Sequence, residues 1–184
     1  MYKIGLIGSP SAGKSTLAAQ VYHRCKILGI QTELVQEFVR EELNKGWIMR
    51  SVSDQIRLQM KQREKEDIIP SNIEVLVTDS PTLLQYIYGL RFSKVAKEDI
   101  HALTFLYEEY IKDSDRYDKI YYVNNIRSDI SPDGTRKESA QECAAIGEEL
   151  KIMMRLHHIP FIEVDGNDTA IDIIMADIQH AIKK

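Results

Sequence analysis

Cysteine is scarce and no long apolar run is present, and each absence excludes a class of protein. Cys25 and Cys143 are the only cysteines, too few for a disulfide framework and not spaced as a Cys-x-x-Cys metal site. Two reduced thiols in helices are expected instead. No apolar stretch approaches the roughly 20 residues that span a bilayer, and Met1–Gly8 is too short and too glycine-rich for a signal peptide. We therefore expect a cytoplasmic protein without membrane contact.

Positive charge does not dominate the sequence. There are 24 Lys and Arg against 28 Asp and Glu, a net charge of −4, so no overall positive field attracts nucleic acid. A local basic pocket for phosphate is compatible with that balance. The 43% hydrophobic and 28% charged content is ordinary for a globular protein. We predict one domain over residues 1–184, as a monomer or homodimer.

Apolar strand-like stretches alternate with helix-like stretches along the chain. The predicted strands are 2–8, 32–35, 74–79, 119–123 and 160–164. The predicted helices are 14–29, 36–45, 53–69, one capped by Ser80 with Pro81 in its first turn, 97–112, 137–157 and 169–182. Because helices separate the strands, we expect an α/β fold in three layers, with a parallel sheet covered on both faces.

One motif carries most of the functional argument. Residues 8–16 read GSPSAGKST and fit G-x-x-x-x-G-K-[ST], between an apolar strand and an amphipathic helix. The glycines let the backbone wrap phosphate oxygens, and the helix N-terminus adds positive potential. We expect Lys14 to reach the β- and γ-phosphates and Ser15 to ligate Mg²⁺. The predicted ATP-binding residues of this loop are Gly8, Ser11, Ala12, Gly13, Lys14, Ser15 and Thr16.

Charged residues follow two other predicted strands at the same sheet edge, where ligands bind in parallel sheets. Asp79 ends the buried strand VLVTD; we expect it to hold Mg²⁺, and it is a second candidate for the base. A mere helix cap is the alternative for Asp79. Glu37 is predicted to take the proton of an attacking hydroxyl, and Arg40 to hold the acceptor's charge. A surface i, i+3 ion pair is the alternative for Glu37 and Arg40.

Two further groups of polar residues are candidates for the site. The helix 53–69 carries Gln55, Gln59, Gln62 and Glu66 on one stripe. Amides can read a heterocycle edge, and Gln62 is predicted to contact the acceptor, although a solvated face is the commoner explanation of such a stripe. Arg127 and Arg136 flank a polar loop with a turn signal. We predict a lid over about 125–137 whose arginines close over the triphosphate; two merely exposed arginines are the alternative.

Four segments together resemble a known family. GSPSAGKSTLA, LVQEFVRE, VLVTDSP and DGTR are similar in order and spacing to the P-loop domain of ribosylnicotinamide kinases and related phage and bacterial nucleotide-kinase-like proteins. The resemblance covers residues 3 to about 165 and implies a five-stranded parallel sheet of order 2-3-1-4-5, ATP in the loop and a mobile lid. By position it implies that Glu37 and Arg40 face the acceptor, that Asp79 lies at Mg²⁺, that Arg127 and Arg136 belong to the lid, and that Asn167 borders adenine.

Other P-loop classes have features that this sequence lacks. After the strand 119–123 the chain reads NNIR, without the Asn-Lys-x-Asp guanine reader of GTPases, and Ser80 follows Asp79 where motor-type ATPases have a catalytic glutamate. We therefore predict a kinase that uses ATP and Mg²⁺ to phosphorylate a small acceptor: a nucleoside, a nucleotide or a ribosylnicotinamide-like molecule. A kinase acting on modified nucleic acid and an ATP-binding or ATPase regulator without an acceptor are the alternatives.

Overall fold

The strand that leads into the phosphate-loop motif lies at the centre of the sheet. This is seen in a computed structural model that describes residues 1–93, 96–124 and 139–183. The sheet has five strands in the order β2-β3-β1-β4-β5, and every pairing is parallel, as predicted. The strands are β1 (Tyr2–Ile7), β2 (Thr32–Val35), β3 (Val75–Thr78), β4 (Lys119–Asn124) and β5 (Ile162–Asp165).

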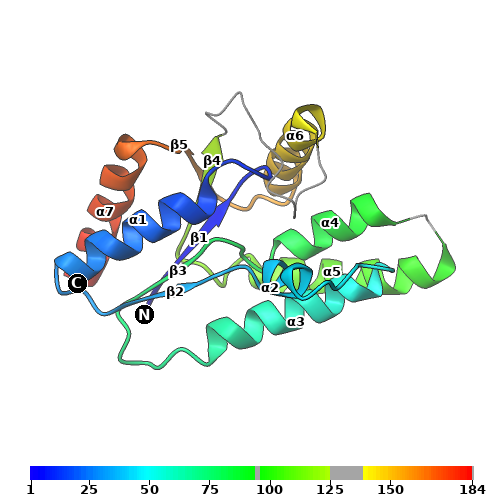
Figure 1. The fold of residues 1–184 in the computed structure, drawn as a ribbon, viewed down its shortest axis with the longest axis horizontal. Coiled ribbons are helices and arrows are strands. Elements are labelled where there is room, and N and C mark those ends of the chain that lie inside the picture. Colours follow the sequence, from blue (N-terminus) through cyan, green and yellow to red (C-terminus); the bar gives the residue numbers. More distant parts are fainter. Residues whose placement is uncertain (94–95, 125–138, 184) are drawn as a thin grey trace.

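Helices cover both faces of this sheet (Figure 1). α1 and α7 lie together on one side, where Val21 and Ile174 are fully buried in one cluster with Ile4 of β1. On the other face, α4, α6 and Tyr110 of α5 form a second cluster with Ile7. The helices are α1 (Lys14–Ile27), α2 (Phe38–Asn44), α3 (Ser53–Asp67), α4 (Leu84–Phe92), α5 (Lys97–Asp113), α6 (Ala140–Leu156) and α7 (Asp168–Ile182).

Three helices extend the molecule beyond the sheet. α3, α4 and α5 pack against one another, and the short α2 packs on α3 (Figure 1). Val52, just before α3, is buried with Ala102 and Leu106 of α5 in a small separate cluster. The first turn of α2 and the carboxyl end of β3 therefore lie beside a helical layer that is distinct from the core around β1.

Most predicted elements are present, with ends shifted by a few residues. The cap predicted at Ser80 was wrong: α4 begins at Leu84, with Leu83 at the N-cap position. A turn precedes the helix, because Leu84 N–H donates to the Pro81 carbonyl and Thr82 N–H is taken by the Tyr117 hydroxyl. α6 begins at Ala140 behind a reciprocal capping box of Ser139 and Glu142 that the helix prediction overlooked.

Candidate functional site

The phosphate loop leaves β1 and enters α1 through backbone conformations that favour glycine. Gly8 has φ +155° and Gly13 has φ +88°. A Cβ at residue 8 would also lie only 2.6 Å from the Val123 carbonyl oxygen of β4. Ser11 has φ +65°, a left-handed conformation that costs free energy for a residue with a side chain. The loop is thus a constrained shape set against the end of β4.

Lys14 folds back over this loop. Its ammonium donates to the carbonyls of Gly8, at 3.0 Å, and Ser9, at 2.8 Å. It is also the first residue of α1, whose N-terminus has no side-chain cap and no acidic residue in its first turn. A helix N-terminus without acidic neighbours retains its positive potential, so the loop can accept an anion. Ser15 and Thr16 follow in the same turn and are exposed.

The two candidate carboxylates meet at the carboxyl edge of the sheet. β3 lies between β2 and β1: Thr78 pairs with Val35 on one side and with Gly5 on the other. Asp79, the next residue, is 5% exposed, and its Oδ1 accepts the Glu37 N–H at 2.9 Å. Parallel register therefore brings together two segments that are 42 residues apart in the sequence.

Glu37 and Arg40 form an ion pair on the outer side of this edge. The Arg40 Nε lies 3.7 Å from the Glu37 carboxylate, and the two side chains are 40% and 31% exposed. An exposed pair at this distance adds little stability. Both groups are accessible to a molecule from solution, so the i, i+3 pairing and an acceptor-binding role are compatible.

The polar stripe on α3 is buried, so a solvated face was the wrong interpretation. Gln55, Gln59, Gln62 and Glu66 are each between 1% and 4% exposed. Each bonds to a different segment: Gln59 Nε2 donates to Asp113, and Glu66 accepts from Arg116 and Tyr117. Helical spacing identified the stripe, but the partners of Gln59 and Glu66 lie about 50 residues away in the sequence.

Other predicted residues lie apart from this cluster or outside the described residues. Arg127 and Arg136 fall in the stretch 125–138, which is not described, so their lid role stays a prediction. Asn167 follows β5, and its Oδ1 accepts the Ala170 N–H at 3.2 Å as the N-cap of α7. That bond gives Asn167 a structural role and leaves its predicted position beside adenine untested.

A magnesium site can be assessed from its oxygen donors. Within the described ranges, no group of three or more His, Cys, Asp and Glu side chains is arranged to hold a metal. Mg²⁺ bound with nucleotide usually takes only one or two protein oxygens and completes its shell with phosphate and water. The Ser15 hydroxyl and the Asp79 carboxylate fit that donor set.

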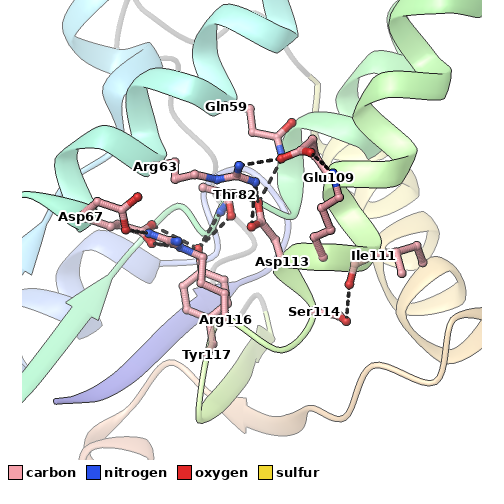
Figure 2. Close-up of polar contacts among 12 residues, drawn as sticks. Gln59, Arg63, Asp67, Thr82, Glu109, Ile111, Asp113, Ser114, Arg116 and Tyr117 are labelled. Carbon is pink, nitrogen blue, oxygen red and sulfur yellow. Dashed lines mark hydrogen bonds and ion pairs between the residues drawn. The ribbon is translucent and has the colours of Figure 1, made fainter.

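A second polar cluster joins the end of α3 to Arg116 and Tyr117, two partners that were missed from the sequence. Figure 2 shows Arg116 beside Asp67 and Tyr117, with Thr82 close to the Tyr117 hydroxyl. Burial raises the pKa of the Glu66 carboxyl, which Arg116 at 2.9 Å offsets only in part. No pattern in the sequence pairs Glu66 with Arg116 and Tyr117, which lie about 50 residues further along the chain.

A glycine-shaped loop entering a helix, an aspartate after the adjacent strand and the 2-3-1-4-5 parallel sheet define a P-loop nucleotide-binding fold. A family model described as an AAA domain matches residues 3–170, and the chain belongs to that family. No curated protein matches the sequence.

Solved structures with similar folds include two kinds of protein. NadR protein in complex with NR has a TM-score of 0.73 and 22% identity, covering 95% of this chain and 51% of that chain. NadR in complex with NAD and AMP-PNP has a TM-score of 0.69 and 20% identity, covering 97% and 49%. Deoxyadenosine kinase from M. mycoides has a TM-score of 0.66 and 17% identity, covering 97% and 98%.

These TM-scores establish a shared fold, in agreement with the resemblance drawn from the sequence motifs. The chain spans about half the length of the NadR chains. Across the part of the chain that the structure describes, no helix has the length and apolar character needed to cross a membrane.

Proposed function

We propose that this chain is an Mg·ATP-dependent phosphotransferase that acts on a nucleoside-like, nucleotide-like or ribosylnicotinamide-like acceptor. The observation that carries the proposal is the 2.9 Å bond from the Glu37 backbone to the Asp79 carboxylate. It holds a candidate base beside a candidate metal ligand, at the sheet edge where the phosphate loop begins. The structural likeness to NadR and to deoxyadenosine kinase supports an acceptor of this chemical class.

The residues then divide the chemistry among them. The acceptor hydroxyl oxygen forms a bond to the γ-phosphorus as the bond to the β,γ-bridging oxygen breaks, and ADP leaves with that electron pair. Glu37 takes the hydroxyl proton, and Arg40 orients the acceptor. Lys14 leaves the loop carbonyls to neutralise charge on the γ-phosphate oxygens. Mg²⁺ on Ser15 and Asp79 would supply further charge neutralisation when bound.

The test uses the purified protein with Mg·ATP and a panel of nucleosides, nucleotides, ribosylnicotinamide and DNA ends. We expect ADP and a phosphorylated acceptor to form in equal amounts with one class of small acceptor. Lys14→Ala should lower the rate by about 10²- to 10³-fold, because one charged donor to the transferred group is lost. Lys26→Ala, an exposed lysine at the end of the same helix, is the matched control and should leave the rate unchanged.

An ATPase without an acceptor is the second candidate, favoured by the AAA-domain description of the family. It predicts that ADP forms at the same rate with and without every acceptor in the panel. ATP binding without any ADP indicates a regulatory module. Transfer to DNA ends alone identifies a kinase of nucleic acid.

A further inference from the structure

The Gln62 side chain is buried and hydrogen-bonded within the protein, which is not expected of a residue that contacts an acceptor. It is 1% exposed, and both atoms of its amide are bonded within the protein. Oε1 accepts the Phe38 N–H at 2.9 Å, and Nε2 donates to the Thr78 hydroxyl at 3.3 Å. The same hydroxyl oxygen accepts the Ser80 N–H at 3.3 Å. One side chain of α3 thus connects the start of α2 to the end of β3.

The turn that carries Glu37 is held at three successive residues. The Lys65 ammonium of α3 donates to the Gln36 carbonyl at 2.9 Å, and the Glu37 and Phe38 N–H groups donate to Asp79 and Gln62. N–H groups at the start of a helix have no partner within the helix, so these side chains supply what α2 cannot. The position of Glu37 is therefore set by α3 and the end of β3.

The turn that carries Asp79 is also linked to α3 at Thr82, through the Tyr117 hydroxyl. The Thr82 N–H donates to the Tyr117 hydroxyl at 2.9 Å, and that hydroxyl donates to the Glu66 carboxylate at 3.1 Å. Figure 2 shows Tyr117 and Thr82 close together beneath α3. Glu66 lies one helical turn after Gln62, so one face of α3 holds both ends of the segment 78–82, directly at Thr78 and through Tyr117 at Thr82.

We propose that Gln62 is a positioning residue for phosphoryl transfer, holding Glu37 at a fixed distance from Asp79, and that it does not read the acceptor. The inference rests on the proposed function, in which Glu37 is the base. A displacement of a catalytic group by about 1 Å can cost on the order of 10²-fold in rate. Loss of the Gln62 amide releases the Phe38 N–H and so frees the turn on which Glu37 stands.

The test compares Gln62→Met with Gln59→Met. Methionine is similar to glutamine in length and has no amide, and Gln59 lies on the same buried face, where its amide bonds to Asp113 of α5. For Gln62→Met we expect kcat to fall about 10- to 100-fold, with the acceptor KM almost unchanged. Hydrogen exchange of the Phe38 amide, measured without acceptor, should become faster. Gln59→Met should change none of these quantities.

Three results overturn the inference. One is a raised acceptor KM with kcat kept, because that identifies Gln62 as a reader of the acceptor. The others are unaltered exchange at Phe38 and an unaltered kcat. If the wild-type protein transfers phosphate to no acceptor, the proposed function fails, whereas the exchange measurement still decides whether Gln62 holds the turn.

Discussion

Glu37 and Asp79 lie so close that their chemical roles must be separated by substitution. The bond between them uses the backbone of Glu37, so the Glu37 side chain can be changed without removing it. Asp79 contributes its carboxylate to that bond and is largely buried, whereas the Glu37 side chain is 31% exposed. Exposure favours Glu37 as the group that meets an acceptor.

Glu37→Gln is therefore expected to lower phosphoryl transfer by at least about 10²-fold and to leave ATP affinity unchanged. The amide cannot take a proton, while the phosphate loop is untouched. Steady-state transfer and ATP titration measure the two quantities. Asp79→Asn, in comparison, should raise the Mg²⁺ concentration needed for half-maximal rate. If transfer survives in Glu37→Gln and is abolished in Asp79→Asn, the base is Asp79.

Among the elements outside the loop motif itself, α6 packs closely against the phosphate loop. Gly147 allows this helix to approach so closely that a Cβ there would lie 2.7 Å from the Tyr122 hydroxyl and 3.3 Å from the Ser9 Cβ. Ser9 belongs to the loop, and its carbonyl accepts from Lys14. A side chain at residue 147 would therefore come into close contact with Ser9 and displace the loop.

Gly147→Ala should destabilise the fold by about 1–3 kcal/mol through overpacking, and should weaken ATP binding. This sign opposes helix propensity, which alone would favour alanine by about 1 kcal/mol. Denaturant unfolding and ATP titration measure the effects. Ala144→Gly, at an exposed position of the same helix, reports propensity alone. Increased stability in Gly147→Ala would contradict the prediction, because it would show that Tyr122 and Ser9 can shift to admit a methyl group without cost.

The start of α6 provides a test of pH dependence. Hydrogen bonds from the backbone and the side chain of Ser139 lower the pKa of Glu142 below 4.5, its ordinary value. A lowered folded-state pKa means that the capping box stabilises the protein above about pH 4.5, the unfolded value, and that this contribution is lost as the pH falls through the folded value.

Glu142→Ala should accordingly be less stable than the wild type at pH 7, with a difference that shrinks at about pH 3.5. Denaturant unfolding at the two pH values measures it. Gln141→Ala, an exposed neutral neighbour, should show no such change with pH. A Glu142→Ala difference that is equal at both pH values contradicts the assignment.

For the molecule as a whole, the loop is bonded into the sheet at its centre, so a bound nucleotide should stabilise the entire fold. Mg·ATP at 100 times its Kd should add about 2.7 kcal/mol to the free energy of unfolding. Thermal unfolding with and without nucleotide measures the shift in Tm. Lys14→Ala should show a much smaller shift at the same concentration. An equal shift in both proteins would place the binding site elsewhere.

The overall architecture was accessible from the sequence because apolar runs such as VLVT are buried on both faces, and because the phosphate-loop motif marks the end of β1. The interior of the α3–α5 layer was not accessible. Gln59, Arg63 and Glu66 bond to partners about 50 residues distant, and a pattern of polar residues does not reveal which partner each will meet. Likewise, the sequence does not reveal that the Thr82 N–H bonds to the Tyr117 hydroxyl, and the helix predicted to start at Ser80 begins at Leu84.

The central place of β1 has a consequence for the order of events during synthesis. β1 is made before the other four strands, yet its neighbours in the sheet are β3 and β4, which end at residues 78 and 124. On the ribosome, the strand that leads into the phosphate loop therefore gains β3 first, and it has both of its neighbours only when about two thirds of these 184 residues have emerged. Until then part of the apolar surface of β1 lacks the strand that buries it, so we expect nucleotide to stabilise the chain only after β4 has been made.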